Sequence, residues 1–144
     1  MTATITKVLD VKRLGERLTI VTIGIPDADF GVREVIANLR DDGSPRWEVG
    51  EVCVYIGEGS IIPEDVLKAR GYWNDEKNRG FLDGNKYNRV KRRKMAGVET
   101  VGLLFKTGEQ VGAQGKSYCV VRGTDACDVS VGDDVTDFFG ITKP

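Results

Sequence analysis

A strongly basic segment lies in the middle of the sequence and is followed directly by small and apolar residues. Residues 85–105 read NKYNRVKRRKMAGVETVGLLF, and six of the first ten are cationic. Clustered ammonium and guanidinium groups bind phosphates, and an aromatic ring among them can stack on a nucleobase. The sequence therefore offers seven candidate nucleic-acid contacts. They are Lys86, Tyr87, Arg89, Lys91, Arg92, Arg93 and Lys94.

Charge is distributed in blocks along the chain, although its net charge is only −1. Residues 27–65 contain ten acids and three arginines, whereas residues 68–94 contain ten bases and three acids. The tail from residue 124 is acidic again. This uneven distribution of charge indicates the kind of partner that the chain binds rather than its fold. Composition alone leaves open whether the basic block is a binding site or merely a solvated face.

Residue types used by most enzymes are missing. The chain has no histidine, which removes the commonest general base and all His-based triads. Three cysteines without histidine are a poor set of zinc ligands, and Cys53 is predicted to be a small core residue. Gly108, Gly112 and Gly115 have neither P-loop nor Rossmann spacing, and hairpin turns explain them better. We therefore expect no catalytic residue, no metal and no cofactor.

Short strands must position the basic segment. Alternating apolar and β-branched residues predict strands, with Val52, Val54 and Ile56 on one side of the fourth. The predicted strands are residues 4–11, 18–25, 32–39, 49–57, 87–91, 101–105 and 118–121.

Helices are few. A short helix is predicted over residues 63–70 with Pro63 at its start, and a weak one between Asp133 or Asp134 and Gly140. Residues 71–84 are expected to form a long ordered loop. This pattern indicates a mainly all-β, five-stranded oligonucleotide-binding (OB) barrel with one or two short helices. We expect a single domain over residues 1–144.

A closed barrel would force the basic segment outward. In a strand, Arg92 and Lys94 would share the inward face of Val90, where unpaired cations carry a large desolvation cost. The strand should therefore leave the barrel at or soon after Lys91, so that residues 92–94 form a protruding corner. Nearby aromatic residues could stack on bases, but Trp73 and Phe81 could equally close the long loop onto the barrel.

Three segments resemble, in the same order, the N-terminal OB-fold domain of Deinococcus/Naegleria-type ATP-dependent RNA ligases. They are VGEVCVYIGEGSIIP, RVKRRKMAGVETVGLLF and VGDDVTDFFGITKP. The part AGVETVGLLF more distantly resembles the tRNA-binding OB domain of the phenylalanyl-tRNA synthetase β chain. Ala96 departs from the ligase pattern, which tends to have an arginine there, and Thr100-Val101 replaces Ser-Gln. The resemblance implies RNA as the ligand.

The same resemblance argues against catalysis. Ligases of this superfamily attach AMP to the lysine of a Lys-x-Asp-Gly motif, whereas FLDG at residues 81–84 has Phe81 in that place, and phenylalanine is no nucleophile. A ligase would also continue beyond Pro144 into its nucleotidyltransferase domain. We therefore expect a non-catalytic module that binds RNA or another single-stranded nucleic acid.

Two alternatives remain open. The chain could be a protein-interaction module, such as an accessory subunit of a separate nucleotidyltransferase or a viral or mobile-element modulator in a phage or bacterium. It could also be a piece of a longer ligase. No apolar run is long enough to span a membrane, and residues 1–13 lack a signal-peptide pattern. We therefore expect a cytoplasmic protein with no membrane partner.

Overall fold

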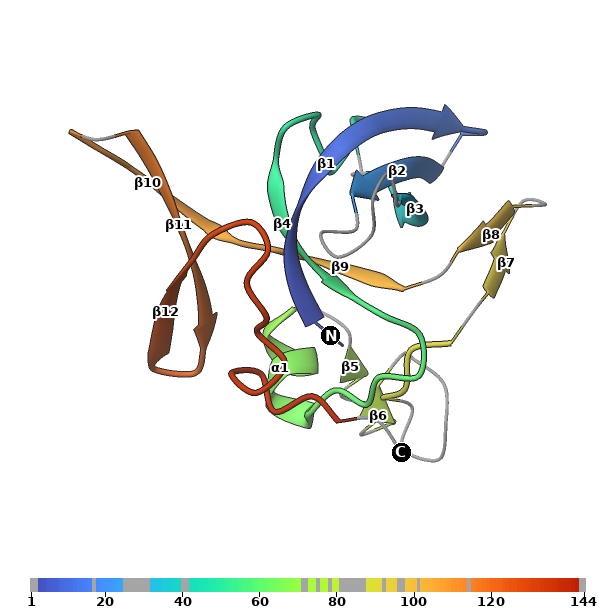
Figure 1. The fold of residues 1–144 in the computed structure, drawn as a ribbon. Coiled ribbons are helices and arrows are strands. Elements are labelled where there is room, and N and C mark those ends of the chain that lie inside the picture. The colour runs from blue at the N-terminus through green and yellow to red at the C-terminus, as the bar shows by residue number, and fades with distance from the viewer. Residues whose placement is uncertain are drawn as a thin grey trace.

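Antiparallel strands dominate the computed structural model, as the β-branched sequence predicts (Figure 1). The strands are β1 Ala3–Leu14, β2 Leu18–Gly24, β3 Val32–Asn38, β4 Val52–Ile56, β5 Trp73–Asn74, β6 Arg79–Gly80, β7 Arg93–Met95, β8 Val98–Thr100, β9 Leu103–Lys106, β10 Gly108–Gly112, β11 Gly115–Arg122 and β12 Asp125–Val129, and the helix is α1 Glu64–Ala69. The structure describes residues 3–16, 18–24, 32–39, 42–70, 73–74, 76–77, 79–80, 88–91, 93–95, 98–100, 102–113 and 115–142.

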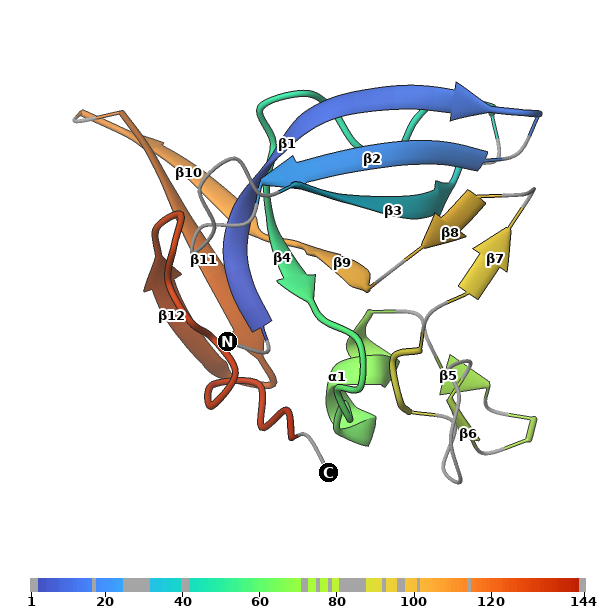
Figure 2. The same cartoon turned by 45° about the vertical axis from the view of Figure 1, so that its right-hand side comes forward.

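The main sheet has five strands in the order β3-β2-β1-β4-β9 and curls into a half-barrel (Figure 2). Its long strand β1 pairs with β4 over Ala3 to Lys7 and with β2 from Val8 onward, and the register shifts between Val8 and Asp10. Such a bulge bends a strand and increases its twist, which lets one strand serve both halves of a curled sheet. The predicted all-β, OB-like fold is confirmed.

The core lies on both faces of β4. Val52, Val54 and Ile56 belong to one apolar cluster, as their alternation predicts. Cys53 points the other way into a second cluster, so the expectation of a single buried side was incomplete. Its predicted core position is confirmed, and burial raises the pKa of the Cys53 thiol to about 12. The thiol is therefore inert at neutral pH.

Helix α1 forms where it was predicted, with Pro63 as its N-cap residue. The second predicted helix was wrong, because residues 136–140 form only turns. The Asp134 carboxylate does accept a hydrogen bond from the Thr136 amide at 2.9 Å, but Gly140 takes a φ of 64° and ends the segment one turn later. Too few residues separate the cap from the glycine for a helix to propagate.

A second sheet, in the order β10-β11-β12, was only partly predicted. Residues 118–121 proved to be the centre of the longer β11, and β10 follows β9 directly after Thr107. Gly112 and Gly115 face each other across a hairpin turn, as expected. Gly108 lies within β10 instead, where a Cβ atom would stand 2.9 Å from the Cys119 sulfur.

The predicted loop over residues 71–84 contains a small hairpin, β5–β6. Among the described residues no helix is long and apolar enough to cross a membrane.

Candidate nucleic-acid interface

The described part of the basic segment, residues 88–91, is fastened to residues 59–62 by backbone hydrogen bonds. The Val90 amide donates to the Ser60 carbonyl at 2.9 Å, and the Gly59 amide donates to the Val90 carbonyl at 2.7 Å. Only Arg89 forms a bridge, with Ile61, so the predicted strand over residues 87–91 was wrong for its described part. The hydrogen bonds nevertheless hold the segment in one orientation.

Side chains along this segment alternate between the core and solvent. Val90 is 3 % exposed and packs in the main core cluster. Lys91 is exposed and takes part in no ion pair with any residue that the structure describes. Arg89 is half-buried, and its Nε is a buried donor with no hydrogen-bond partner among the residues that the structure describes. Val90 therefore anchors the segment, while Lys91 presents a free positive charge to solvent.

After Lys91 the chain leaves these hydrogen bonds, as predicted, and the described Arg93 and Lys94 follow in a strand. Both belong to β7, which pairs with β8 in a separate hairpin near β3 (Figure 2). Its register places Lys94 opposite Glu99. Two of the predicted site residues are thus held on a paired strand.

The remaining predicted contacts, Lys86, Tyr87 and Arg92, lie outside the described residues, as do Phe81 and the rest of the FLDG motif. Whether they join Lys91 at one surface stays a prediction.

Trp73 closes the long loop onto the barrel, one of the two roles considered for it. Its ring packs against the main core cluster, and the Lys68 ammonium lies 5.0 Å from the ring centroid. Lys68 also forms an ion pair with Glu64 at 2.8 Å. This aromatic residue and this cation are therefore engaged within the molecule.

Arg70, another member of the basic block, is used for packing. Its guanidinium lies 5.2 Å from the Phe105 centroid and 5.6 Å from the Phe139 centroid. Burial lowers the pKa of Arg70, and its Nε has no hydrogen-bond partner in the described part of the chain. The block charge counted from sequence therefore overstates the charge available at the surface.

Arg122 was not singled out from the sequence, yet it joins helix α1 to β11. Its guanidinium donates to both Asp65 carboxylate oxygens, at 3.0 and 3.2 Å. This bidentate pair lowers the pKa of Asp65 and raises that of Arg122. The Arg122 guanidinium also occupies the space where a Cβ at Gly140 would stand.

Sequence reasoning also missed cations at the β1–β2 turn, which lies on the same side of the molecule as β7–β8 (Figure 2). Lys12 is 74 % exposed, with Asp10 4.0 Å away. Arg13 donates to the Gly15 and Glu16 carbonyls at 3.1 and 3.4 Å, which holds its guanidinium at the turn. The loop between the first two strands of an OB fold commonly contacts oligonucleotides, and that rule is the signal that could have found them.

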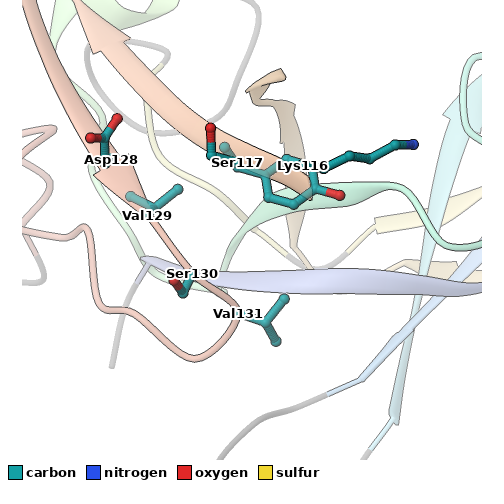
Figure 3. A pocket seen from close by; sticks show the side chains of 7 residues that line it. Lys116, Ser117, Asp128, Val129, Ser130 and Val131 are labelled. Carbon is teal, nitrogen blue, oxygen red and sulfur yellow. The ribbon is translucent and has the colours of Figure 1, made fainter. Parts of the chain in front are cut away.

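A hollow of about 360 Å³ lies where the ends of β11 and β12 diverge. Figure 3 shows that the Lys116 ammonium and the Asp128 carboxylate point away from each other rather than into a shared space. Since small-molecule sites need convergent polar groups, the hollow is a poor ligand site. Among the described residues no group of three His, Cys, Asp or Glu side chains could hold a metal ion.

No family model matches the sequence, and neither does any curated protein. Solved structures of the RNA ligase of Naegleria gruberi do match. An apo variant has a TM-score of 0.58 at 19 % identity, and a variant with AMP and Mn a TM-score of 0.57 at 18 %. The complex with PPi has a TM-score of 0.56 at 20 %. This chain resembles an RNA ligase domain.

The likeness covers 99 % of this RNA ligase-like chain but 34 % of each of those solved chains. The chain thus spans about a third of the length of the structures it matches. At this level of identity the comparison establishes the fold, and the resemblance predicted from three sequence segments is confirmed.

Proposed function

We propose that this chain binds RNA through its basic segment, residues 86–94, and does so without catalysing a reaction. The observation that carries the proposal is the anchoring of Val90 in the core beside an exposed Lys91 that has no ion-pair partner among the described residues. The anchor fixes which way the segment faces, so the charge is presented in a constant direction. The likeness to an RNA ligase domain makes RNA the first nucleic acid to test.

The mechanism is electrostatic capture of phosphates, assisted by stacking on Tyr87. A single strand releases about 0.7 counterions for each phosphate that a cation neutralises. If all six cations of the segment contact phosphates, the logarithm of the association constant should fall with the logarithm of salt concentration with a slope of about −4. A base stacked on an aromatic ring adds about 1–3 kcal/mol.

Matched double charge reversals test the site. R92E/R93E should weaken binding to single-stranded RNA at least about tenfold, because two phosphate contacts become repulsive. K7E/R46E makes the same charge change at two exposed cations elsewhere and should bind nearly as the wild type does. Electrophoretic mobility shifts with single-stranded RNA, tRNA and duplex DNA measure this. Equal losses in both variants would reduce the proposal to a non-specific charge effect.

The proposed lack of catalysis rests on the sequence motif: the nearest approach to Lys-x-Asp-Gly is FLDG, which has Phe81 in the place of the lysine. Incubation with ATP labelled at its α-phosphate should leave the chain unlabelled. Covalent AMP on this chain would overturn that part of the proposal.

A second function, docking on a separate nucleotidyltransferase subunit or another protein, is favoured by the acidic side of the molecule. The exposed Asp125 and Asp128 lie on β12, far from β7–β8 in both views (Figures 1 and 2). RNA would be repelled there, whereas a basic protein would not. A partner retained by R92E/R93E/K94E after nuclease treatment would support this function over RNA binding.

A further inference from the structure

The hairpin formed by β10 and β11, here called the arm, has no role in the proposed RNA site. It extends from the barrel on the side opposite β7–β8 (Figures 1 and 2). β10 is an outer strand of the three-stranded sheet, so one of its backbone edges is unpaired among the described strands. Val111 on this strand is 77 % exposed, the highest value among the large apolar side chains that the structure describes. An unpaired strand edge presents backbone donors and acceptors that can pair with a strand of another chain.

Apart from its shortness and one charge, the β10 edge lacks the devices that usually prevent strand pairing. Its sequence GEQVG has no lysine and no proline, and its pairing with β11 runs without a bulge. Its one charge, on Glu109, is neutralised by the Lys116 ammonium at 3.0 Å, a contact that also raises the pKa of Lys116. By contrast, the outer strand β12 carries the exposed carboxylate of Asp128, which has no ion-pair partner among the described residues.

We propose that a second copy of this chain pairs with this edge, β10 against β10, antiparallel and about a two-fold axis at Gln110. The three-stranded sheets of the two copies, β10-β11-β12, then form one six-stranded sheet. This register covers all of β10, with Gly108 opposite Gly112 of the second copy and Glu109 opposite its Val111. The contact is isologous and therefore closes as a dimer.

Neighbouring registers are less favourable. An axis at Glu109 would place two carboxylates directly opposite each other, which is destabilising. An axis at Val111 would carry the pairing into the turn at Ala113 and leave Gly108 unpaired. The axis at Gln110 sets each exposed valine beside a glutamate whose charge its own arm already neutralises.

Pairing would leave the basic segments of both copies free, because the arm and β7–β8 lie on opposite sides of the molecule (Figure 1). The dimer itself does not depend on RNA, so its failure would leave the proposed function untouched.

Sedimentation velocity over a range of protein concentrations tests the dimer. The wild type should show a reversible monomer–dimer equilibrium, and V111K should raise the dissociation constant at least about tenfold, because a charged edge opposes pairing. V131K is the matched control, since Val131 is 51 % exposed and lies outside the arm. A wild type that stays monomeric at the highest concentration, or equal effects of the two variants, would overturn the proposal.

Disulfide trapping tests the register. In a mixture of E109C and V111C under oxidised glutathione, mixed dimers should exceed either homodimer, because these positions face each other within disulfide reach. Q110C alone should form a homodimer across the axis. The wild type, whose three cysteines are free, controls for background cross-linking. Predominant V111C homodimers would contradict the proposed register.

Discussion

Cations gather in two regions of this molecule, and they are used in opposite ways. Around α1, the guanidinium of Arg122 pairs with Asp65, and that of Arg70 lies over two phenylalanine rings. Beside the buried Val90, Lys91 instead faces solvent with no carboxylate partner among the described residues. Similar side chains thus stabilise the fold in one region and remain available to a ligand in the other. The difference comes from the neighbouring groups, because a carboxylate and two aromatic rings lie within reach of the cations around α1.

The comparison predicts that changes around α1 alter stability, whereas changes along the basic segment alter affinity. The largest effect on stability is expected for F139A. Phe139 is fully buried against Phe105 and Arg70, so its truncation should cost about 3–5 kcal/mol of unfolding free energy. Urea denaturation followed by circular dichroism measures this. The RNA affinity of the protein that remains folded should be unchanged. A loss of affinity in that folded protein would contradict the separation of stabilising residues from RNA-binding residues.

Arg70 separates packing from charge. R70A removes the side chain that lies over the two rings and should lower the unfolding free energy by about 1–2 kcal/mol. Both the apolar stem of Arg70 and its charged guanidinium contribute to this packing. R70M keeps an apolar stem and removes the buried, unpaired Nε, so its stability should lie within about 1 kcal/mol of the wild type. Urea unfolding of both variants checks this. A loss in R70M as large as that in R70A would mean that the charge itself is required.

The Arg122–Asp65 pair should have a smaller effect, about 0.5–1 kcal/mol for R122A, because both side chains are partly exposed. The contribution should depend on pH. The pKa of Asp65 is lowered in the folded state, so the stabilisation is present above the ordinary value of 3.8 and is lost as pH falls through the folded pKa. R122A should lack this acid-dependent loss. Unfolding free energies measured at neutral and acidic pH test this pH dependence. R122K is the control, because it keeps the positive charge but cannot form the bidentate hydrogen bonds of a guanidinium.

Replacement of Lys91 should have the smallest effect on stability and a clear effect on binding. K91A leaves the core unchanged and should alter unfolding free energy by less than about 0.5 kcal/mol. It should reduce the magnitude of the salt slope of RNA binding by about 0.7, since one phosphate contact is lost. K7A, at another exposed lysine, should leave the slope as it is. If K91A lost more unfolding free energy than binding free energy, Lys91 would be a residue that stabilises the fold rather than one that binds RNA.

Particular residues show how far the sequence could predict this structure. The strand state of β1 to β4, the helix start at Pro63 and the core position of Cys53 followed from local pattern and were confirmed. The inward direction of Val90 also followed, because a closed sheet has no room for the neighbouring cations.

Other features depend on contacts between distant residues, which a single sequence does not reveal. Arg122 lies 57 positions from Asp65, so nothing local identified their pair. The arm was missed because β10 contains two glycines and only one apolar residue, and its strand state depends on pairing with β11. The cations at the β1–β2 turn are candidate contacts only because the sheet places that turn on the same side of the molecule as β7–β8 (Figure 2).

The salt dependence of RNA binding tests the central claim most directly. The association constant of the wild type for single-stranded RNA, measured over a series of salt concentrations, should fall with a logarithmic slope of about −4. Removal of three phosphate contacts in R92E/R93E/K94E should bring the slope to about −2. No detectable binding at low salt, or an affinity that does not change with salt, would contradict the account.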